Sequence, residues 1–492
     1  MSRLHPRVTP RPATTHRAAR GAASLIVVLL LFLVLSLTAA YTSRNLIFEQ
    51  KTSANQARST TAFEAADAGV EWTLTQLNGG RIDANCTEST SAADLSFQQR
   101  YLTIATNGNI SQKPRAAGSL SPRVWPTCVF NGATLNCACP SGAAVDPTAS
   151  VGVGSFPAFR VWPAVFEPAG PTASPWTVFP APRPGLLALT VSGCTRLPAS
   201  AAETCMDYVS RGEIGEGLAG VRALIALRSG LATLPAAAVT ARLDVVPYPP
   251  APAVPSSSDP KLGVVNTDQR SGFTVNTAGS IETTRFAPQG IPGTPAEFSL
   301  APDDLRLLKT SLVAPAGSST YGPELTGGDR MFVTTFGMRR QTYREQPGVR
   351  VCPSATCTDV NTALAENPNR IIWVQGNLAL TAPLGTAAAP VLLIVDGETL
   401  TLGPGVQIHG FVYMTGGDTD TSTILLPPDA PTAITGAVVA EGRLLTDYTG
   451  TPLPVANRLT ITYDAALLEL LRTTYGSWVR LPGSWRDFKG TP

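Results

Sequence analysis

The most pronounced hydrophobic pattern lies near the N-terminus, where residues 22–40 run for nineteen positions without a charge. At a rise of about 1.5 Å per residue, a helix of that length spans about 29 Å. This is close to the hydrocarbon thickness of a bilayer, which takes roughly 20 apolar residues to cross. The segment therefore predicts a membrane-spanning helix.

The helical pattern continues beyond this apolar run. Residues 42–77 contain no proline, and their apolar positions recur at steps of three or four, which places them on one face of a helix. These positions are Phe63, Ala66, Val70, Leu74 and Leu77. Asn78-Gly79-Gly80 then forms a typical C-terminal stop. We expect one unbroken helix over residues 22–77, half in lipid and half with an alanine-rich face for packing.

After Gly80 the pattern is that of β structure. Ser, Thr, Asn, Gly and Pro interrupt short β-prone runs, among them residues 123–125, 186–191 and 221–227. A proline-rich stretch over residues 246–256 is expected to be extended and to connect two blocks. We place a boundary near Pro260.

The final third contains an irregular repeat in which an aliphatic residue precedes a glycine by two positions. The repeat begins at Val374, Val395, Ile408 and Ile434. Such a pattern favours the coils of a parallel β-solenoid or a stacked sheet, with an antiparallel sandwich as the alternative. A short helix, N-capped by Asp464, is expected near the end of the chain.

The predicted fold class is α+β, with a long N-terminal transmembrane helix followed by a large β-rich head whose C-terminal part is solenoid-like and ends in a short helix. The expected divisions are a basic leader (1–21), the helix (22–78), a β-rich head domain (79–260), a β-rich connecting region (261–370) and the solenoid-like region (371–492).

Composition adds limits to this picture. With 492 residues, 43% of them hydrophobic and 15% charged, the chain can bury one or two sizeable cores and is not a disordered tail. The 43 glycines and 43 prolines favour a turn-rich β protein. Only three histidines are present, and two of them, His5 and His16, lie in the leader, so a histidine-dependent site would rest on His409 alone.

The charges are distributed unevenly. The first 20 residues hold five arginines and no acid, which predicts a cytoplasmic leader and an exported remainder by the positive-inside rule. The rest of the chain has 32 basic against 35 acidic residues. This balance gives no sign of a direct nucleic-acid partner.

All eight cysteines lie on the expected exported side, where disulfides form. Spacing predicts two local bridges, Cys194 to Cys205 and Cys352 to Cys357. The other four admit three pairings; we expect one of Cys137 and Cys139 to close a hairpin with Cys128 and the other to reach Cys86. A cysteine zinc site is the less favoured alternative, because no CxxC pair or nearby histidine accompanies them.

Other chemical signals are weak, and we expect no catalytic residue, no metal and no cofactor. Residues 215–220 match GxGxxG, but residues 221–227 have the pattern of a strand, which favours a turn. Asp418-Thr419-Asp420 offers two carboxylates to calcium, although a solvated turn is favoured. Trp478 and Trp485 are expected to pack in the core, or alternatively to anchor the C-terminal segment or a partner.

The two ends of the chain resemble PilX-type minor pilins of type IV pili, in their large β-proteobacterial form. The resemblance rests on Arg20-Gly21-Ala22-Ala23 and, at the other end, on residues 434–444, 459–472 and 481–488. It also rests on the helix motif Ala62, Phe63, Glu64, Ala65, Ala66, Asp67, Ala68 and Gly69. It implies that a prepilin peptidase cuts after Gly21 and leaves Ala22 as the new N-terminus. The chain departs from major pilins in carrying Ile26 where they have a glutamate.

The resemblance implies a non-enzymatic minor pilin that primes pilus assembly and then sits in the tip complex. Its implied partners are other minor pilins, a PilY-type tip adhesin, the prepilin peptidase and the inner membrane. The implied location is a single pass through the inner membrane with a periplasmic head, and the pilus tip after assembly. The alternatives are a minor pseudopilin of a type II secretion system and a membrane-anchored surface adhesin or enzyme.

Overall fold

A computed structural model describes the chain in segments, and it divides into two compact units, Met1–Thr61 and Ala62–Pro492. The described residues are 19–113, 126–141, 156–164, 183–196, 205, 216–248, 261–268, 273–277, 279–281, 285–289, 297–300, 327–353, 360–427, 430–448 and 459–487. The first unit holds the first part of the N-terminal helix, and the second holds the last turns of that helix and the β-rich head.

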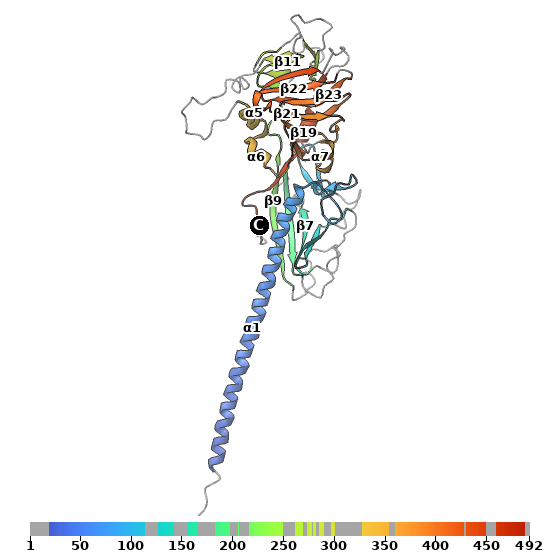
Figure 1. Ribbon diagram of the computed structural model, residues 1–492. Coiled ribbons are helices and arrows are strands. Elements are labelled where there is room, and N and C mark those ends of the chain that lie inside the picture. Colours follow the sequence, from blue (N-terminus) through green and yellow to red (C-terminus); the bar gives the residue numbers. More distant parts are fainter. Residues whose placement is uncertain are drawn as a thin grey trace, which may run out of the picture. The chain divides into compact units, whose positions relative to one another are not determined.

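Helix α1 (Ala19–Leu77) is the one long helix of the described chain (Figure 1). In the first unit the described side chains from Ser24 onward are exposed except that of Thr61, and the helix is long and apolar enough to cross a membrane. The helix begins three residues before the expected start. It ends where the sequence predicts, because the amide of Asn78 bonds the carbonyl of Leu74 and that of Gly79 bonds the carbonyl of Gln76.

The second unit contains an antiparallel sheet of six strands. In order across the sheet these are β26 (Gly476–Arg480), β9 (Leu218–Ser229), β8 (Leu186–Cys194), β7 (Ala158–Ala164), β5 (Thr127–Phe130) and β6 (Leu135–Ala138). Two small hairpin-like pairs and one helix accompany it: β1 (Arg81–Ile82) with β2 (Leu95–Ser96), β3 (Leu102–Ile104) with β4 (Ile110–Gln112), and α2 (Phe97–Tyr101). The expected runs at 186–191 and 221–227 are thus strands, whereas residues 123–125 lie outside the described chain.

The same unit contains a parallel β-solenoid with two sheets. The larger sheet, of eleven strands, comprises β10 (Ala237–Ala241), β12 (Leu262–Val265), β13 (Phe273–Thr277), β14 (Phe286–Gln289), β15 (Glu297–Leu300), β16 (Val349–Pro353), β17 (Ile371–Gln375), β19 (Val391–Asp396), β21 (Gln407–Met414), β23 (Thr432–Ala440) and β25 (Leu459–Tyr463). The smaller comprises β11 (Val245–Pro247), β18 (Leu378–Leu380), β20 (Thr399–Leu402), β22 (Thr421–Leu426) and β24 (Arg443–Tyr448). The antiparallel sandwich considered from sequence is therefore wrong for this part.

Alternating burial explains why these segments form stacked strands. In β22, positions alternate between half-buried and buried, and the inward residues include Ile424 and Leu426. Inward residues of the larger sheet, such as Val374 and Val395, share a hydrophobic core with Leu400 and others of the smaller sheet. A period of two along each strand therefore fills the space between the two sheets.

The register of the solenoid matches the sequence repeat at two of its three steps. Val374 lies opposite Val395, and Ile408 lies opposite Ile434. Val395, however, lies opposite Met414 and not Ile408, because β21 begins earlier on its coil than β19. The glycines of the repeat therefore fall into two classes, with Gly376 and Gly397 at corners and Gly410 and Gly436 inside strands.

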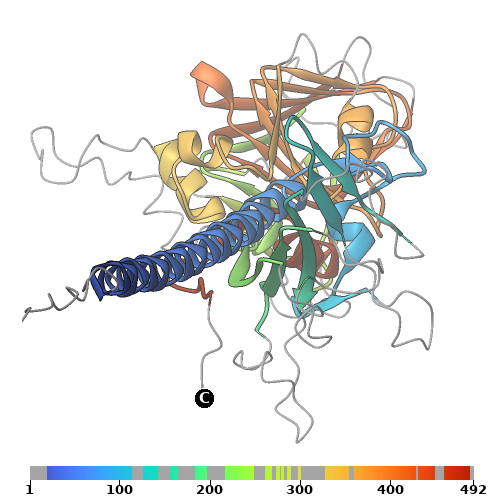
Figure 2. The ribbon, with the colours of Figure 1, turned by 90° about the horizontal axis from the view of Figure 1, so that it is seen from below.

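Four further helices, of five to ten residues, complete the described head. They are α5 (Gly327–Phe336), α6 (Arg340–Arg344), α7 (Val360–Glu366) and α8 (Ala465–Thr474), and a 3₁₀ turn, η3 (Gly417–Thr419), precedes β22. Figure 2 shows α5 and α6, in yellow, beside the parallel strands. Their Phe332 and Tyr343 pack against Trp373 of β17. As predicted, the carboxylate of Asp464 caps α8 by accepting from the amide of Leu467.

Strand pairing links segments that are distant in sequence. Strand β10, which precedes the proline-rich stretch, and β11, which includes its first residues, pair with β23 and β24 of the solenoid. Strands from either side of the boundaries expected near residues 260 and 370 thus belong to one sheet. At the other end, β26 leaves the solenoid and pairs with β9 in the antiparallel sheet. The solenoid therefore contains strands from the N-terminal part of the head, and the antiparallel sheet contains a strand from the C-terminal end of the chain.

Replacing Gly436 by alanine tests the tight stacking of the coils. Its φ is +134°, and a Cβ atom there would lie 1.9 Å from the carbonyl oxygen of Gly410. We expect Gly436→Ala to lower the free energy of unfolding by about 1–3 kcal/mol or more, because both the strained backbone and the overlap oppose it. Thermal unfolding followed by tryptophan fluorescence measures this.

The matched control is Thr401→Ala, on the half-buried face of β20, which should change stability by no more than about 0.5 kcal/mol. Equal melting temperatures for the two variants would contradict the close backbone approach at Gly436.

Candidate functional site

The end of helix α1 is built into the antiparallel sheet, and we call this region, residues 62–77 with the strands beneath, the helix seat. A Cβ atom on Gly193 of β8 would lie 2.0 Å from the carbonyl oxygen of Ala62. A Cβ atom on Gly69 would lie 2.6 Å from Val191 and 2.7 Å from Phe159. Helix and strand backbones thus approach as closely as they do because glycine occupies one position on each.

The motif residues divide according to their place on this helix. Ala62 and Ala66 are fully buried, and Gly69 is buried beside them. Phe63, Ala65 and Asp67 are half-buried, whereas Glu64 and Ala68 are exposed. Small residues thus face the sheet, and an acidic residue faces outward. The structure therefore gives the alanine-rich face a packing partner within the same chain.

The C-terminal segment fastens the end of the helix to the sheet. The side-chain amide of Asn78 donates to the carbonyl of Trp478 (2.9 Å), and its oxygen accepts from the Trp478 amide (2.8 Å). Trp478 lies in β26, the edge strand of the sheet, and pairs with β9 on its other side. The Asn78 side chain therefore takes the place of a further strand on this edge.

Trp485 and Arg480 extend this fastening along the helix. The indole of Trp485 meets Phe63 edge-on, with ring centroids 5.6 Å apart, and its N–H donates to Asp67 (3.2 Å). Arg480 forms an exposed ion pair with Glu71 at 2.9 Å. Trp478 is buried in the core and Trp485 packs against the same core, in line with the sequence expectation. Their proximity to the helix could not be predicted, because hundreds of residues separate the partners.

Three disulfides hold loops of the described head. Cys128 is bonded to Cys137 across the β5–β6 hairpin, and Cys139 is bonded to Cys86, just beyond the helix seat. A third bond joins Cys194 to Cys205. Cys352 lies buried in β16, but Cys357 is outside the described residues, so their bridge stays a prediction.

The expected processing site lies at the other end of α1. Gly21 and Ala22 fall in the first turn of the helix, which starts at Ala19. The leader up to residue 18 is outside the described chain. Cleavage after Gly21 therefore stays a prediction from the sequence.

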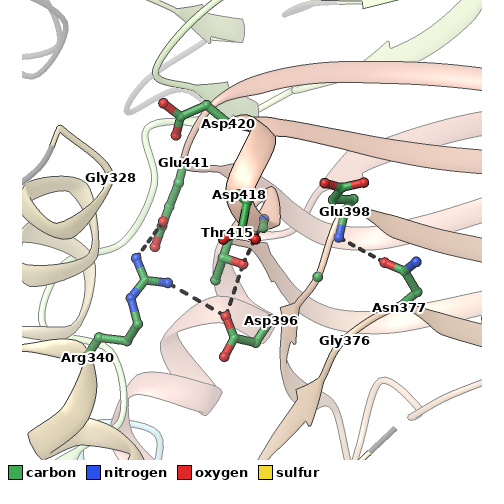
Figure 3. A pocket seen from close by; sticks show the side chains of 12 residues that line it. Gly328, Arg340, Gly376, Asn377, Asp396, Glu398, Thr415, Asp418, Asp420 and Glu441 are labelled. Atoms are coloured by element: carbon green, nitrogen blue, oxygen red, sulfur yellow. Dashed lines mark hydrogen bonds and ion pairs between the residues drawn. The ribbon is translucent and has the colours of Figure 1, made fainter.

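A second feature is a polar cavity of about 630 Å³ at the corners of the solenoid (Figure 3). It is lined by Gly328, Arg340, Gly376, Asn377, Asp396, Gly397, Glu398, Thr415, Gly417, Asp418, Asp420 and Glu441. Most of these belong to the corners that come after β17, β19, β21 and β23. The cavity therefore collects side chains from four successive coils.

Arg340 and Glu441 form the inner wall of this cavity. The Arg340 guanidinium lies 2.7 Å from a carboxylate oxygen of Glu441 and 3.4 Å from Asp329, and the other Glu441 oxygen accepts from the Tyr413 hydroxyl at 2.8 Å. The Glu441 side chain is only 3% exposed. Burial raises the pKa of Glu441 to about 7, although Arg340 and the Tyr413 hydrogen bond oppose the rise.

The Asp418-Thr419-Asp420 turn lies at the rim of the same cavity. Asp420 pairs with Arg242 at 3.0 Å, and Asp418 and Thr419 belong to the 3₁₀ segment η3, which Asp420 follows. Within the described ranges, no three His, Cys, Asp or Glu side chains gather in a way that could hold a metal ion. Of the GxGxxG match, Leu218 to Gly220 lie in strand β9, whereas Gly215 is outside the described residues.

A comparison with models of protein families finds a match for the N-terminal segment. Residues 20–71 match the family model described as PilX N-terminal. The matched stretch runs from just before the expected cleavage point through the helix motif and into the helix seat. No curated protein and no solved structure matches the chain. The match supports a PilX-type pilin and says nothing about the large β-rich head.

The fastening at Asn78 makes a measurable contribution to stability. Asn78→Ala leaves both the amide and the carbonyl of the buried Trp478 without partners, so we expect a loss of about 2–4 kcal/mol in the free energy of unfolding. Arg480→Ala, which removes an exposed ion pair of the same segment, should cost about 0–1 kcal/mol. Chemical unfolding of the two variants compares them, and a smaller loss for Asn78→Ala than for Arg480→Ala would refute this role of Asn78 at the sheet edge.

The buried Glu441 predicts a pH dependence of stability. The pKa of Glu441 is about 7 in the folded chain against an ordinary 4.5, so the folded state binds the proton more tightly than the unfolded state. The contribution of Glu441 to the free energy of unfolding therefore falls as the pH rises from about 4.5 through 7. The groups facing it are Arg340, Tyr413 and Asp329. We expect Glu441→Gln to reduce the change of the melting temperature with pH between pH 5 and 8. An unchanged slope in this variant would show that Glu441 does not titrate in that range.

Proposed function

We propose that the protein is a minor pilin that enters the type IV pilus and sits in its tip complex. The observation that carries the proposal is the PilX N-terminal match over residues 20–71, which coincides with a membrane-length apolar helix. A pilin of this kind is anchored in the membrane by its helix before assembly. The large head is then carried outward on that helix.

The missing acid near the N-terminus supports a place at the end of the fibre. After cleavage behind Gly21, the fifth residue of the mature chain is Ile26, which cannot pair with the N-terminal amine of a neighbouring subunit. An unpaired charge in an apolar environment is costly. A subunit used once at the tip avoids that cost, because no subunit lies ahead of it. Its size, 492 residues, also suits a subunit that is not repeated along the fibre.

Within the proposed tip complex, the helix packs with other minor pilins and the head contacts them and a PilY-type adhesin. In this role the protein primes assembly and requires no chemistry of its own. The alternatives remain distinguishable. A pseudopilin of a type II secretion system shares the missing acid but does not appear on surface pili, and a surface enzyme would remain active after removal of the helix.

Processing of the N-terminus tests the proposal directly. In cells with a prepilin peptidase, the mature chain should begin at Ala22, as read by N-terminal sequencing or intact mass. Gly21→Val should abolish cleavage, because a side chain before the cut bond blocks access to the peptidase. Ala19→Val, two residues away, serves as the control and should be processed. A chain that keeps Met1 in cells with an active prepilin peptidase would contradict the proposal.

A further inference from the structure

We propose that the polar cavity of the solenoid binds an organic cation, a ligand that presents ammonium or guanidinium groups. This goes beyond pilin assembly, since the cavity belongs to the head and shares no residue with the helix seat. Its volume of about 630 Å³ lies in the range of small-molecule sites. It is therefore far larger than a single metal ion needs.

The hydrogen-bonding groups of the cavity are mainly acceptors. The Arg340 guanidinium forms ion pairs with Glu441 and Asp329. The Asn377 side-chain oxygen already accepts from the amide of Glu398 at 2.9 Å (Figure 3) and from that of Thr399 at 2.9 Å. This leaves the Asn377 amide nitrogen as a donor that can turn to a ligand.

Two carboxylates in the cavity remain without a partner. Among the described residues, neither Glu398 nor Asp418 has a hydrogen bond or an ion pair from its side chain, and both line the cavity. Within the described ranges, the side chain of Asp396 accepts hydrogen bonds from Thr415 and Trp373, at 3.2 Å each, and Arg340 is more distant at 3.9 Å. A ligand that fits this inventory carries donors, and ammonium and guanidinium groups carry donors only.

The charges agree with the hydrogen-bond inventory. Five carboxyl groups line the cavity against one arginine, and within the described chain only Asp420 has a further basic partner, Arg242. Acidic groups in a recess concentrate a negative potential and raise the local concentration of cations. A neutral sugar fits less well, because its hydroxyls need donors too and no aromatic ring is among the residues that line the cavity.

The buried wall of the cavity responds to the charge of a ligand. Glu441 is held at the back of the cavity by Tyr413 and Arg340, and burial penalises its charged form. A cation in the cavity would stabilise that charged form and lower the pKa of Glu441 again.

Titration calorimetry of the full-length protein in detergent tests the proposal with spermidine and with trilysine. We expect both to bind at low salt, and a Glu398→Gln/Asp418→Asn double variant to bind at least tenfold more weakly. Both carboxylates face the cavity without structural partners, so the variant should keep the wild-type melting temperature. The control Glu345→Gln removes an exposed acid from the end of α6 outside the cavity and should leave binding unchanged.

The outcomes separate the ligand classes. Stronger binding of trilysine than of spermidine would point to a basic segment of a protein partner, and the reverse would point to a free polyamine; either supports the cation site. Equal affinity of the double variant and the wild type for both cations would overturn the proposal. So would binding of cellobiose or calcium at the cavity, lost in the double variant, without binding of either organic cation.

Discussion

The architecture depends on one close approach, between the backbone of α1 and the backbone of β8. Gly193 faces Ala62 and Ala66, and Gly69 faces Val191 and Phe159, so any larger residue at these glycines forces the helix away from the sheet. Because of this contact, the last turns of the helix form part of the head's own hydrophobic core. The helix segment from Ala62 to Leu77 therefore cannot leave the head without exposing part of that core.

The C-terminal strand joins this arrangement to the solenoid. After α8 the chain runs directly into β26, which pairs with β9 and is closed on its free edge by Asn78. The helix, the antiparallel sheet and the solenoid thus meet at one short segment. A pull on the helix would be transmitted through hydrogen bonds and packing at this segment, while the corners of the solenoid coils, where the polar cavity lies, remain free to contact a ligand.

Local signals predicted the elements whose causes are local. Asn78-Gly79-Gly80 marked the helix end at Leu77, Asp464 marked the cap of α8, and the aliphatic and glycine repeat indicated parallel coils. Long-range features had no such signal. The Asn78 to Trp478 bonds span 400 residues. Strands β10 and β11 join the solenoid although they lie on the N-terminal side of the expected boundary at Pro260, and the cavity needs one corner from each of four coils. The pairing of Val395 with Met414 could not be predicted either, because strand lengths vary from coil to coil.

The central claim is that the chain is a pilus subunit whose head packs around the last turns of its helix. Quantitative mass spectrometry of surface pili, sheared from the cells and purified, tests this claim most directly. We predict that the chain is present in the fibres with Ala22 as its N-terminus, with head peptides and helix peptides in equal amounts, and in far fewer copies than the major subunit. Fibres that lack the chain, while all of it remains in the inner membrane, would contradict the claim.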